Sequence, residues 1–334
     1  MAKYSIILPV RNGIPYVKAC VNSILSQTFR DFNFIILDNC STDGTLDWVQ
    51  SLQDNRIKII PADTPLTIEE NWGRIKDTTK NEFITLIGHD DVLYPDFLEN
   101  INQLIEQYPA AGLYHTHFNF IDAHGKLIRK SKPMNSQLTD NKLLEGFLTQ
   151  TFDSMGTGYV MRATDYDGAG GIPVKYPNLL FADFELWLML ASKGGVAVSP
   201  NTCFAFRVHQ STTGTSQDYK LHNALELFVY FLAELKNKDK EKEALVLKHG
   251  NDLLSFYCKG FCHRLLRTTF EKRNGITVNI FIDQTKLLAK KLGIETIYQP
   301  EKIASVSIAK WIDSNKISRA AFLLFKKLYP KPVM

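Results

Sequence analysis

The chain has no long apolar run. Nowhere in its 334 residues does an apolar stretch approach the ~20 residues that a membrane-spanning helix requires. The N-terminus also lacks the basic start, apolar core and small-residue cleavage site of a signal peptide. These two absences argue against a spanning or secreted protein, and we expect a cytoplasmic one.

Cysteine and net charge are also sparse. The cysteines form no spacing framework, which excludes a disulfide scaffold and fits reduced cytosolic thiols. They are Cys20, Cys40, Cys203, Cys258 and Cys262. The formal net charge is only +4, from 39 basic and 35 acidic residues, so we expect no nucleic-acid partner.

Glycine-rich phosphate loops are missing as well. The glycines at 168–171 neither follow a strand nor open a helix, and no Walker-type loop is present. A dinucleotide fingerprint and a P-loop are therefore excluded. A nucleotidyltransferase would need a Gly-rich, Lys- or Arg-bearing loop after the first strand, where only Arg11-Asn12-Gly13 stands.

What the first half does contain is an alternation of strand and helix patterns. The expected strands are 4–10, 32–37, 57–60 and 83–87, and the expected helices are 15–27, 45–52, 68–78 and 95–107. Such alternation is typical of an α/β fold with a mostly parallel sheet covered on both faces.

Later segments are less regular. Asp122-Ala123-His124-Gly125 predicts a hairpin turn. From about residue 219 the pattern becomes helical, apart from a short expected strand at 276–282. We therefore expect one domain at 1–216 and a mainly helical C-terminal region at 217–334.

Two adjacent carboxylates end the strand at 83–87. Asp90 and Asp91 repel each other unless a positive group lies beside them. A hard divalent cation that keeps open positions for phosphate oxygens would neutralise them. The pattern is compatible with a metal–diphosphate site and equally with an Asp-rich surface turn.

Polar loops follow the first two strands. They are Pro9-Val10-Arg11-Asn12-Gly13 and the segment 38–45. Because ligands bind beyond the carboxyl ends of parallel strands, these loops and the acidic pair are expected on one rim. Asp38 or Asn39 can bond a nucleobase edge, whereas Asp43 is better explained as a helix N-cap.

In this order, segments 7–13, 23–28 and 36–45 and the acidic pair resemble the opening of family-2 glycosyltransferases of the GT-A fold. The resemblance covers about residues 4–215. It implies a Rossmann-like, mostly parallel sheet flanked by helices. It also implies an inverting transferase that uses Mn²⁺ or Mg²⁺ and moves a sugar from a nucleotide-diphosphate donor to an acceptor hydroxyl.

The resemblance assigns nucleotide-binding roles. Pro9, Arg11, Asp38 and Asn39 match the family's nucleotide-binding loops. The family often has a second Asp where this chain has Asn39, which leaves the identity of the base open. Asn71 resembles an Asn that helps to hold the nucleotide.

The acidic motif receives separate roles. By the same resemblance, Asp90 lies near the ribose and Asp91 ligates the metal. His89 is expected to be a partly exposed neighbour rather than a ligand.

The catalytic base is implied at the start of a helix. Asp183 matches the family's base, although Ala182 replaces the usual Glu. An inverting displacement needs one carboxylate to take the acceptor's proton. The alternative is that Asp183 only caps the helix, and Glu185 is the second candidate for the base.

A late strand carries the last site residues. Arg207-Val208-His209 resembles the family's Arg-x-His segment, and alternation places Arg207 and His209 on one face. Arg207 offers a forked donor set to phosphate oxygens, and His209 is expected to ligate the metal or bond the diphosphate. The loop at 156–158 resembles the family's acceptor-side loop.

The C-terminal segment leaves two interpretations open. Basic residues surround an apolar core at 320–325, namely Lys316, Arg319, Lys326, Lys327 and Lys331. A basic amphipathic helix can lie on the inner face of the cell membrane, or it can cap the domain through its Phe and Leu residues.

The sequence therefore predicts a glycosyltransferase of polysaccharide or cell-envelope glycan synthesis. Its partners would be a nucleotide-sugar donor and a glycan or lipid-linked acceptor. The alternative function is a non-catalytic nucleotide-sugar-binding or scaffold protein that retains the fold. The joint presence of Asp91, Asp183 and Arg207 argues against that alternative.

Overall fold

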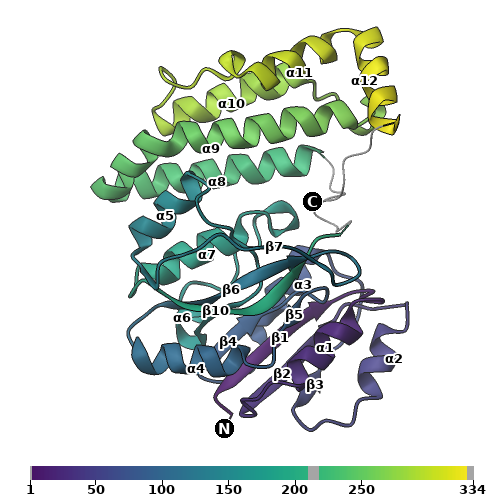
Figure 1. Cartoon of the computed structure of the whole chain (residues 1–334), viewed down its shortest axis with the longest axis vertical. Coiled ribbons are helices and arrows are strands. Elements are labelled where there is room, and N and C mark those ends of the chain that lie inside the picture. Colours follow the sequence, from purple (N-terminus) through teal and green to yellow (C-terminus); the bar gives the residue numbers. More distant parts are fainter. Residues whose placement is uncertain (1, 210–217, 329–334) are drawn as a thin grey trace. The chain divides into compact units, whose positions relative to one another are not determined.

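The computed structural model describes residues 2–209 and 218–328, and Figure 1 shows its elements in chain order. Contacts divide the chain into two compact units. The first comprises 1–143 and 152–209, and the second comprises 144–151 and 210–334. The boundary expected at 216–217 lies outside the described residues.

One mixed sheet organises the first unit. Its strand order is β3-β2-β1-β4-β9-β6-β10-β5. Strands β1, β2, β3 and β4 are mutually parallel, β6 and β10 are parallel, and β9 runs antiparallel between β4 and β6. The strands are β1 (Tyr4–Val10), β2 (Phe32–Asp38), β3 (Ile57–Ile59), β4 (Phe83–Leu86), β5 (Val92–Leu93), β6 (Leu113–Ile121), β7 (Leu127–Lys130), β8 (Gln137–Leu138), β9 (Tyr159–Arg162) and β10 (Val196–Arg207).

Helices connect and cover these strands, so the expected α/β class is confirmed. They are α1 (Val17–Leu25), α2 (Thr45–Gln50), α3 (Ile68–Gly73), η1 (Arg74–Asp77), α4 (Phe97–Gln107), α5 (Asp140–Leu148), α6 (Ala163–Gly168), η2 (Pro177–Leu179) and α7 (Ala182–Ala191). The chain reverses its direction across the sheet between β1 and β4, and such a switch point is where α/β sheets bind ligands.

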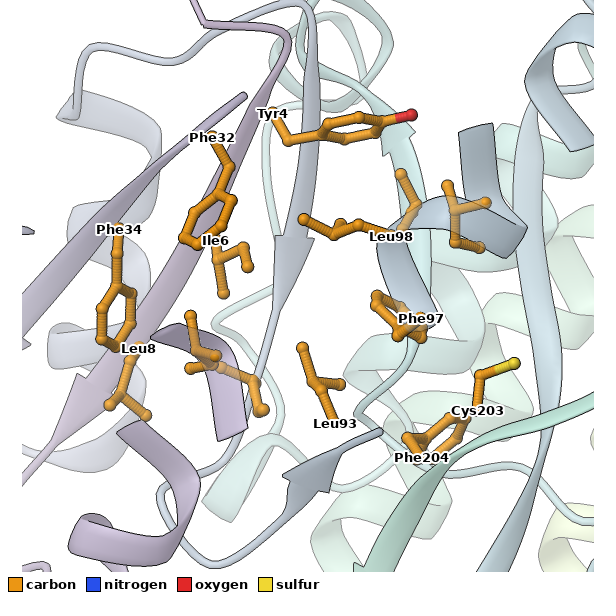
Figure 2. Packing of buried hydrophobic residues seen from close by; sticks show 14 of the residues in the cluster. Tyr4, Ile6, Leu8, Phe32, Phe34, Leu93, Phe97, Leu98, Cys203 and Phe204 are labelled. Carbon is orange, nitrogen blue, oxygen red and sulfur yellow. The ribbon is translucent and has the colours of Figure 1, made fainter. Parts of the chain in front are cut away.

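The core of the first unit follows from strand alternation. Every second residue of β1, namely Tyr4, Ile6 and Leu8, faces the same buried cluster. Phe32 and Phe34 of β2 pack beside them, and Figure 2 shows these side chains with Phe97 and Phe204 from α4 and β10. This packing fixes the strand ends that carry the polar loops.

The hairpin expected at Asp122–Gly125 is confirmed. Strands β6 and β7 pair antiparallel around it. The Asp122 N–H donates to the Lys126 carbonyl, and Gly125 has a φ of 85° that suits glycine.

Helices make up the second unit. They are α8 (Asp218–Lys238), α9 (Lys240–Arg267), η3 (Phe270–Lys272), α10 (Val278–Leu292), η4 (Pro300–Lys302), α11 (Ala304–Ser314) and α12 (Lys316–Leu328). Over the described ranges, no helix combines the length and the apolarity that a membrane crossing would need.

The strand expected at 276–282 is wrong. Thr277 instead caps α10, accepting from the Ile280 N–H at 3.2 Å. Val278, Phe281 and Ile282 are buried at helical spacing against α9, so packing overrides their β-branched and aromatic propensity.

Candidate functional site

The loops after β1 and β2 are tied together by hydrogen bonds. The Asn12 and Gly13 N–H groups donate to Ser41 Oγ and Thr45 Oγ1, each at 2.9 Å. The Ile14 N–H donates to Asp43 Oδ2 at 2.9 Å. Asp43 Oδ1 accepts from the Thr45 N–H at the start of α2, so Asp43 serves the helix terminus and also joins the loops.

Asp38 is fully buried at the end of β2. Its Oδ2 accepts from the Ser41 N–H at 3.1 Å. Its Oδ1 is buried and has no partner within the described part of the chain. Because buried polar atoms are normally hydrogen-bonded, this oxygen is suited to a ligand N–H.

Asn39 uses its amide on the protein itself. Its Nδ2 donates to the Leu66 carbonyl at 2.9 Å, and its Oδ1 accepts from the Leu66 N–H at 2.7 Å. Arg11, which is exposed, also contacts the Leu66 carbonyl at 3.4 Å. Asn39 therefore fixes the segment around Leu66, and Pro9 is buried within β1 on the same side of the site.

Arg74 is a contributor that the sequence analysis did not identify. Its Nη1 donates to the Asp38 carbonyl and to Asn71 Oδ1, each at 3.0 Å. Its Nη2 donates to the Ile60 carbonyl at 2.7 Å and to the Pro61 carbonyl at 3.0 Å. Arg74 and Asn71 thus hold the end of β2 in place through hydrogen bonds. No local sequence motif predicts these contacts.

Asp91 is buried, with both oxygens occupied. Thr157 Oγ1 donates to Oδ2, and the Arg207 N–H donates to Oδ1 at 3.0 Å. Burial, and then the charge of Asp90, raises the pKa of Asp91 to about 8. This carboxyl group therefore ties β10 and the loop before β9 to the end of β4.

Asp90 and His209 form the accessible polar pair at this rim. His209 Nε2 lies 2.6 Å from Asp90 Oδ2. The side chain of His209 is 15% exposed and that of Asp90 is 22% exposed, so both are reachable from solvent. The Tyr16 ring lies 4.8 Å from the His209 ring and covers one side of the pair.

Arg207 is buried and contacts mostly carbonyls. Its Nε donates to the Asp90 carbonyl at 2.8 Å, and its Nη1 donates to the Asp122 carbonyl at 3.1 Å. Its guanidinium carbon lies 4.8 Å from the Tyr16 ring centre. Arg207 thus joins the acidic loop to the β6–β7 hairpin and supplies positive charge beside the carboxylates.

Asp183 lies in the first turn of α7. Its Oδ2 faces Gly156 so closely that a Cβ built on Gly156 would lie 2.8 Å from it. Burial raises the pKa of Asp183 to about 7. A carboxyl group of this kind is suited to exchange a proton near neutral pH.

Glu185, the second candidate, is already paired. Its Oε1 accepts from Lys175 Nζ at 2.9 Å, and its Oε2 accepts from the Tyr176 hydroxyl. These contacts give Glu185 a structural role within the first unit.

The loop Gly156–Gly158 joins these groups. Gly156 lies against Asp183, and Thr157 donates to Asp91. Gly158 has a φ of 85°, and its carbonyl accepts from His115 Nδ1 at 2.8 Å. Burial lowers the pKa of His115 to about 3, so a neutral imidazole holds the loop.

The possible metal ligands at this rim suit a cation that is bound partly by the protein and partly by substrate phosphate. Within 2–209 and 218–328, no three His, Cys, Asp or Glu side chains gather to hold a metal. Mg²⁺ typically binds through one or two protein ligands and completes its shell with water and substrate phosphate. The accessible Asp90–His209 pair fits that pattern.

Comparisons with known proteins bear on the family and the fold of the chain. The model of the family "Glycosyl transferase family 2" matches residues 5–165. The chain is 27% identical over 214 residues to TuaG of Bacillus subtilis, a glycosyltransferase named for teichuronic acid biosynthesis, covering 60% of this chain and 77% of TuaG. It is 24% identical over 123 residues to the glycosyltransferase GlyG of Streptococcus pneumoniae, covering 36% of this chain and 41% of GlyG.

Solved structures show the same fold. TarS of S. aureus, residues 1–349 in complex with UDP-GlcNAc, superposes with a TM-score of 0.65 at 17% identity. The superposition covers 93% of this chain and 91% of the TarS chain.

Proposed function

We propose that the chain transfers a sugar from a nucleotide-diphosphate donor to an acceptor hydroxyl with inversion; the match of residues 5–165 to the family-2 glycosyltransferase model and the likeness of the fold to TarS support this proposal. The observation that carries this proposal is Asp183. The loop 156–158 lies against its carboxyl group at Gly156 and also donates from Thr157 to Asp91, at the acidic end of β4. Burial raises the pKa of Asp183 to about 7, and perturbed pKa values of this kind are common at catalytic sites.

We assign donor recognition to the rim after β1, β2 and β4. The unpartnered Asp38 Oδ1 accepts an N–H from the base. Asn39, Asn71 and Arg74 support it indirectly, because their contacts hold backbone segments, and Pro9 is buried within β1. The exposed Arg11 remains available to the donor from the loop after β1.

We assign the metal to the accessible pair. Asp90 and His209 would hold Mn²⁺ or Mg²⁺, and that ion would neutralise the charge of the leaving diphosphate. The resemblance gave the metal to Asp91 and the ribose to Asp90. The contacts favour Asp90 for the metal, because both Asp91 oxygens are occupied by Thr157 and Arg207.

We assign the proton transfer to Asp183. In an inverting displacement the acceptor hydroxyl attacks the anomeric carbon from the face opposite the diphosphate, and its proton passes to a carboxylate. The Asp183 oxygens receive that proton, and the lack of a side chain at Gly156 leaves Oδ2 unobstructed on that side. Arg207 keeps the acidic loop and the hairpin in register and adds positive charge near the diphosphate.

We place the reaction in cell-envelope glycan synthesis, with a glycan or lipid-linked acceptor. The 27% identity to TuaG over 77% of that protein supports this placement. The donor is a polar nucleotide sugar, so the reaction would occur on the cytoplasmic side of the membrane that holds a lipid-linked acceptor.

A donor screen tests the proposal. Thermal shift is measured with UDP-, GDP-, dTDP- and CMP-linked sugars, with and without Mn²⁺. We expect one nucleotide class to raise the Tm, and the rise to be larger with Mn²⁺, because ligands that bind only the folded state stabilise it. No shift with any of these donors, with or without the metal, would contradict a nucleotide-sugar transferase.

A further inference from the structure

Helices α11 and α12 each bury one face in the same cluster. Val306 and Ala309 of α11 are buried in the cluster that α9 and α10 line, and Phe322 of α12 packs against it. Figure 1 shows the two helices following one another at the yellow end of the chain.

The inward face of α12 carries its buried charge. Arg319 is 5% exposed, and its Nη2 donates to the Thr268 carbonyl at 2.6 Å. Its guanidinium carbon lies 4.1 Å from the Phe270 ring centre. Asp313, which is buried beside it, pairs with Arg273 at 2.8 Å. The C-terminal helix is therefore anchored to its unit by polar and cation–π contacts as well as by Phe322.

The outward faces are apolar. Ile317, Leu324 and Leu328 lie on one side of α12 and are 80%, 60% and 66% exposed. Ile308 and Trp311, one turn apart on α11, are 58% and 66% exposed. An amphipathic helix normally turns its apolar side inward, so α12 has the reverse arrangement. We call these five side chains the α11–α12 apolar face.

Positive charge predominates around this face, although the exposed Glu271 lies near enough to act on Arg319, and Glu301 acts on Lys310. Asp313 is the only acidic residue after Glu301, and it is buried. Lys316 and Lys327 are exposed on α12, and Lys310 and Lys326 are partly exposed. A surface with exposed apolar residues and mainly basic neighbours complements an apolar layer below anionic groups.

We propose that the α11–α12 apolar face inserts into the headgroup region of an anionic membrane, while the flanking lysines contact the lipid phosphates. Trp is favoured at membrane interfaces, and shallow insertion buries the Leu and Ile side chains. A second copy of the chain fits less well, because it would bring the same lysines against one another. The proposal deepens the proposed function by fixing how the enzyme meets a lipid-linked acceptor.

Vesicle co-sedimentation of the full chain tests the proposal. We expect binding to vesicles of mixed phosphatidylglycerol and phosphatidylcholine, and weak binding to phosphatidylcholine alone or at high salt. The double substitution Leu324→Ser/Leu328→Ser should weaken binding by about tenfold or more, because it removes apolar area that would leave water. Lys316→Glu/Lys327→Glu should weaken it by about 30-fold.

Matched controls separate this surface from exposure and charge in general. Leu287→Ser removes a 69% exposed apolar side chain from α10, and Lys259→Glu/Lys290→Glu reverses two exposed charges elsewhere in the second unit. We expect both to bind vesicles as the parent does. If the control variants lose as much vesicle binding as the test variants, the proposal is overturned. It is also overturned if the parent does not bind anionic vesicles.

Two further readouts complete the test. By sedimentation equilibrium, the parent should not form a dimer through the α11–α12 apolar face. A parent dimer that becomes monomeric in Leu324→Ser/Leu328→Ser would overturn the proposal. The thermal shift with nucleotide sugars should be the same in the parent and in this variant. If the parent binds vesicles but nucleotide sugars do not raise its Tm, the membrane-binding proposal is retained and the proposed transferase activity is contradicted.

Discussion

The two sides of the candidate site use their polar side chains differently. On the side of β1 and β2, Asn39, Asn71 and Arg74 are hydrogen-bonded to the protein, and one buried oxygen of Asp38 has no partner among the described residues. On the side of β4 and α7, Asp90 is reachable from solvent, and burial raises the pKa of Asp183. Under the proposed function, the first side holds the donor in place and the second carries out the transfer.

The largest expected effect is on the reactive side. Asp183→Asn keeps the shape of the side chain but removes its ability to take a proton. Turnover with the acceptor should fall by ~10²–10⁴-fold, while the affinity for the donor stays near the parent value. Steady-state kinetics with separate kcat and KM checks this, and near-parental turnover would contradict the role of Asp183.

The same group sets a pH dependence. Because the base must be ionised, kcat should fall about tenfold for each pH unit below the Asp183 pKa of about 7. This folded-state pKa lies above the usual value, so the ionised form destabilises the fold, and the penalty grows as pH rises toward 7. Asp183→Asn should therefore match or exceed the parent's Tm at about pH 8. A large fall in Tm would indicate a structural role instead.

Substitutions on the β1–β2 side of the site should lower the stability of the fold more than they lower the reaction rate. Asn39→Ala leaves the Leu66 N–H and carbonyl without their partners, and we expect a loss of about 2–4 kcal/mol in unfolding free energy. Urea denaturation measures this loss. A change below about 0.5 kcal/mol would mean that the Leu66 contacts do not stabilise the fold.

A neighbouring substitution sharpens the comparison. Asp38→Asn retains an oxygen for the Ser41 N–H but turns an amide N–H toward the ligand. Nucleotide affinity should drop by about tenfold with little change in stability, since one hydrogen bond to the base is lost. Unchanged affinity would remove Asp38 from base recognition.

Much of the first unit was predictable because its signals are local. The alternation of strands and helices and the polar residues at strand ends correctly indicated the sheet. The same pattern placed the loops of Arg11 and Asp38 beside each other, as the hydrogen bonds between these loops show. The carboxyl ends of parallel strands necessarily meet at one edge of a sheet.

What the sequence could not show depends on distant partners. Whether Asp90 or Asp91 faces outward is decided by Thr157 and Arg207, which lie far along the chain. His115 likewise acts through a backbone carbonyl at Gly158, a contact without a sequence pattern.

The helical unit was predicted less well for a related reason. Apolar β-branched residues at 276–282 suggested a strand, whereas the N-cap at Thr277 and the contacts with α9 produce a helix. In α12, Arg319 was counted among the surface charges, but it is buried near Asp313. Helical periodicity shows which residues share a face of such a helix, but it does not show which face packs against the core.

The central assignment is that the accessible Asp90, rather than the buried Asp91, contributes to the metal–diphosphate site. Isothermal calorimetry of the preferred nucleoside diphosphate, with Mn²⁺ and with EDTA, tests it most directly. We predict that Mn²⁺ tightens binding to the parent and to Asp91→Asn, and that Asp90→Asn and His209→Gln lose this gain while their metal-free affinity is unchanged. The account is contradicted if Asp90→Asn keeps the Mn²⁺ gain while Asp91→Asn loses it, or if the parent binds equally with Mn²⁺ and with EDTA.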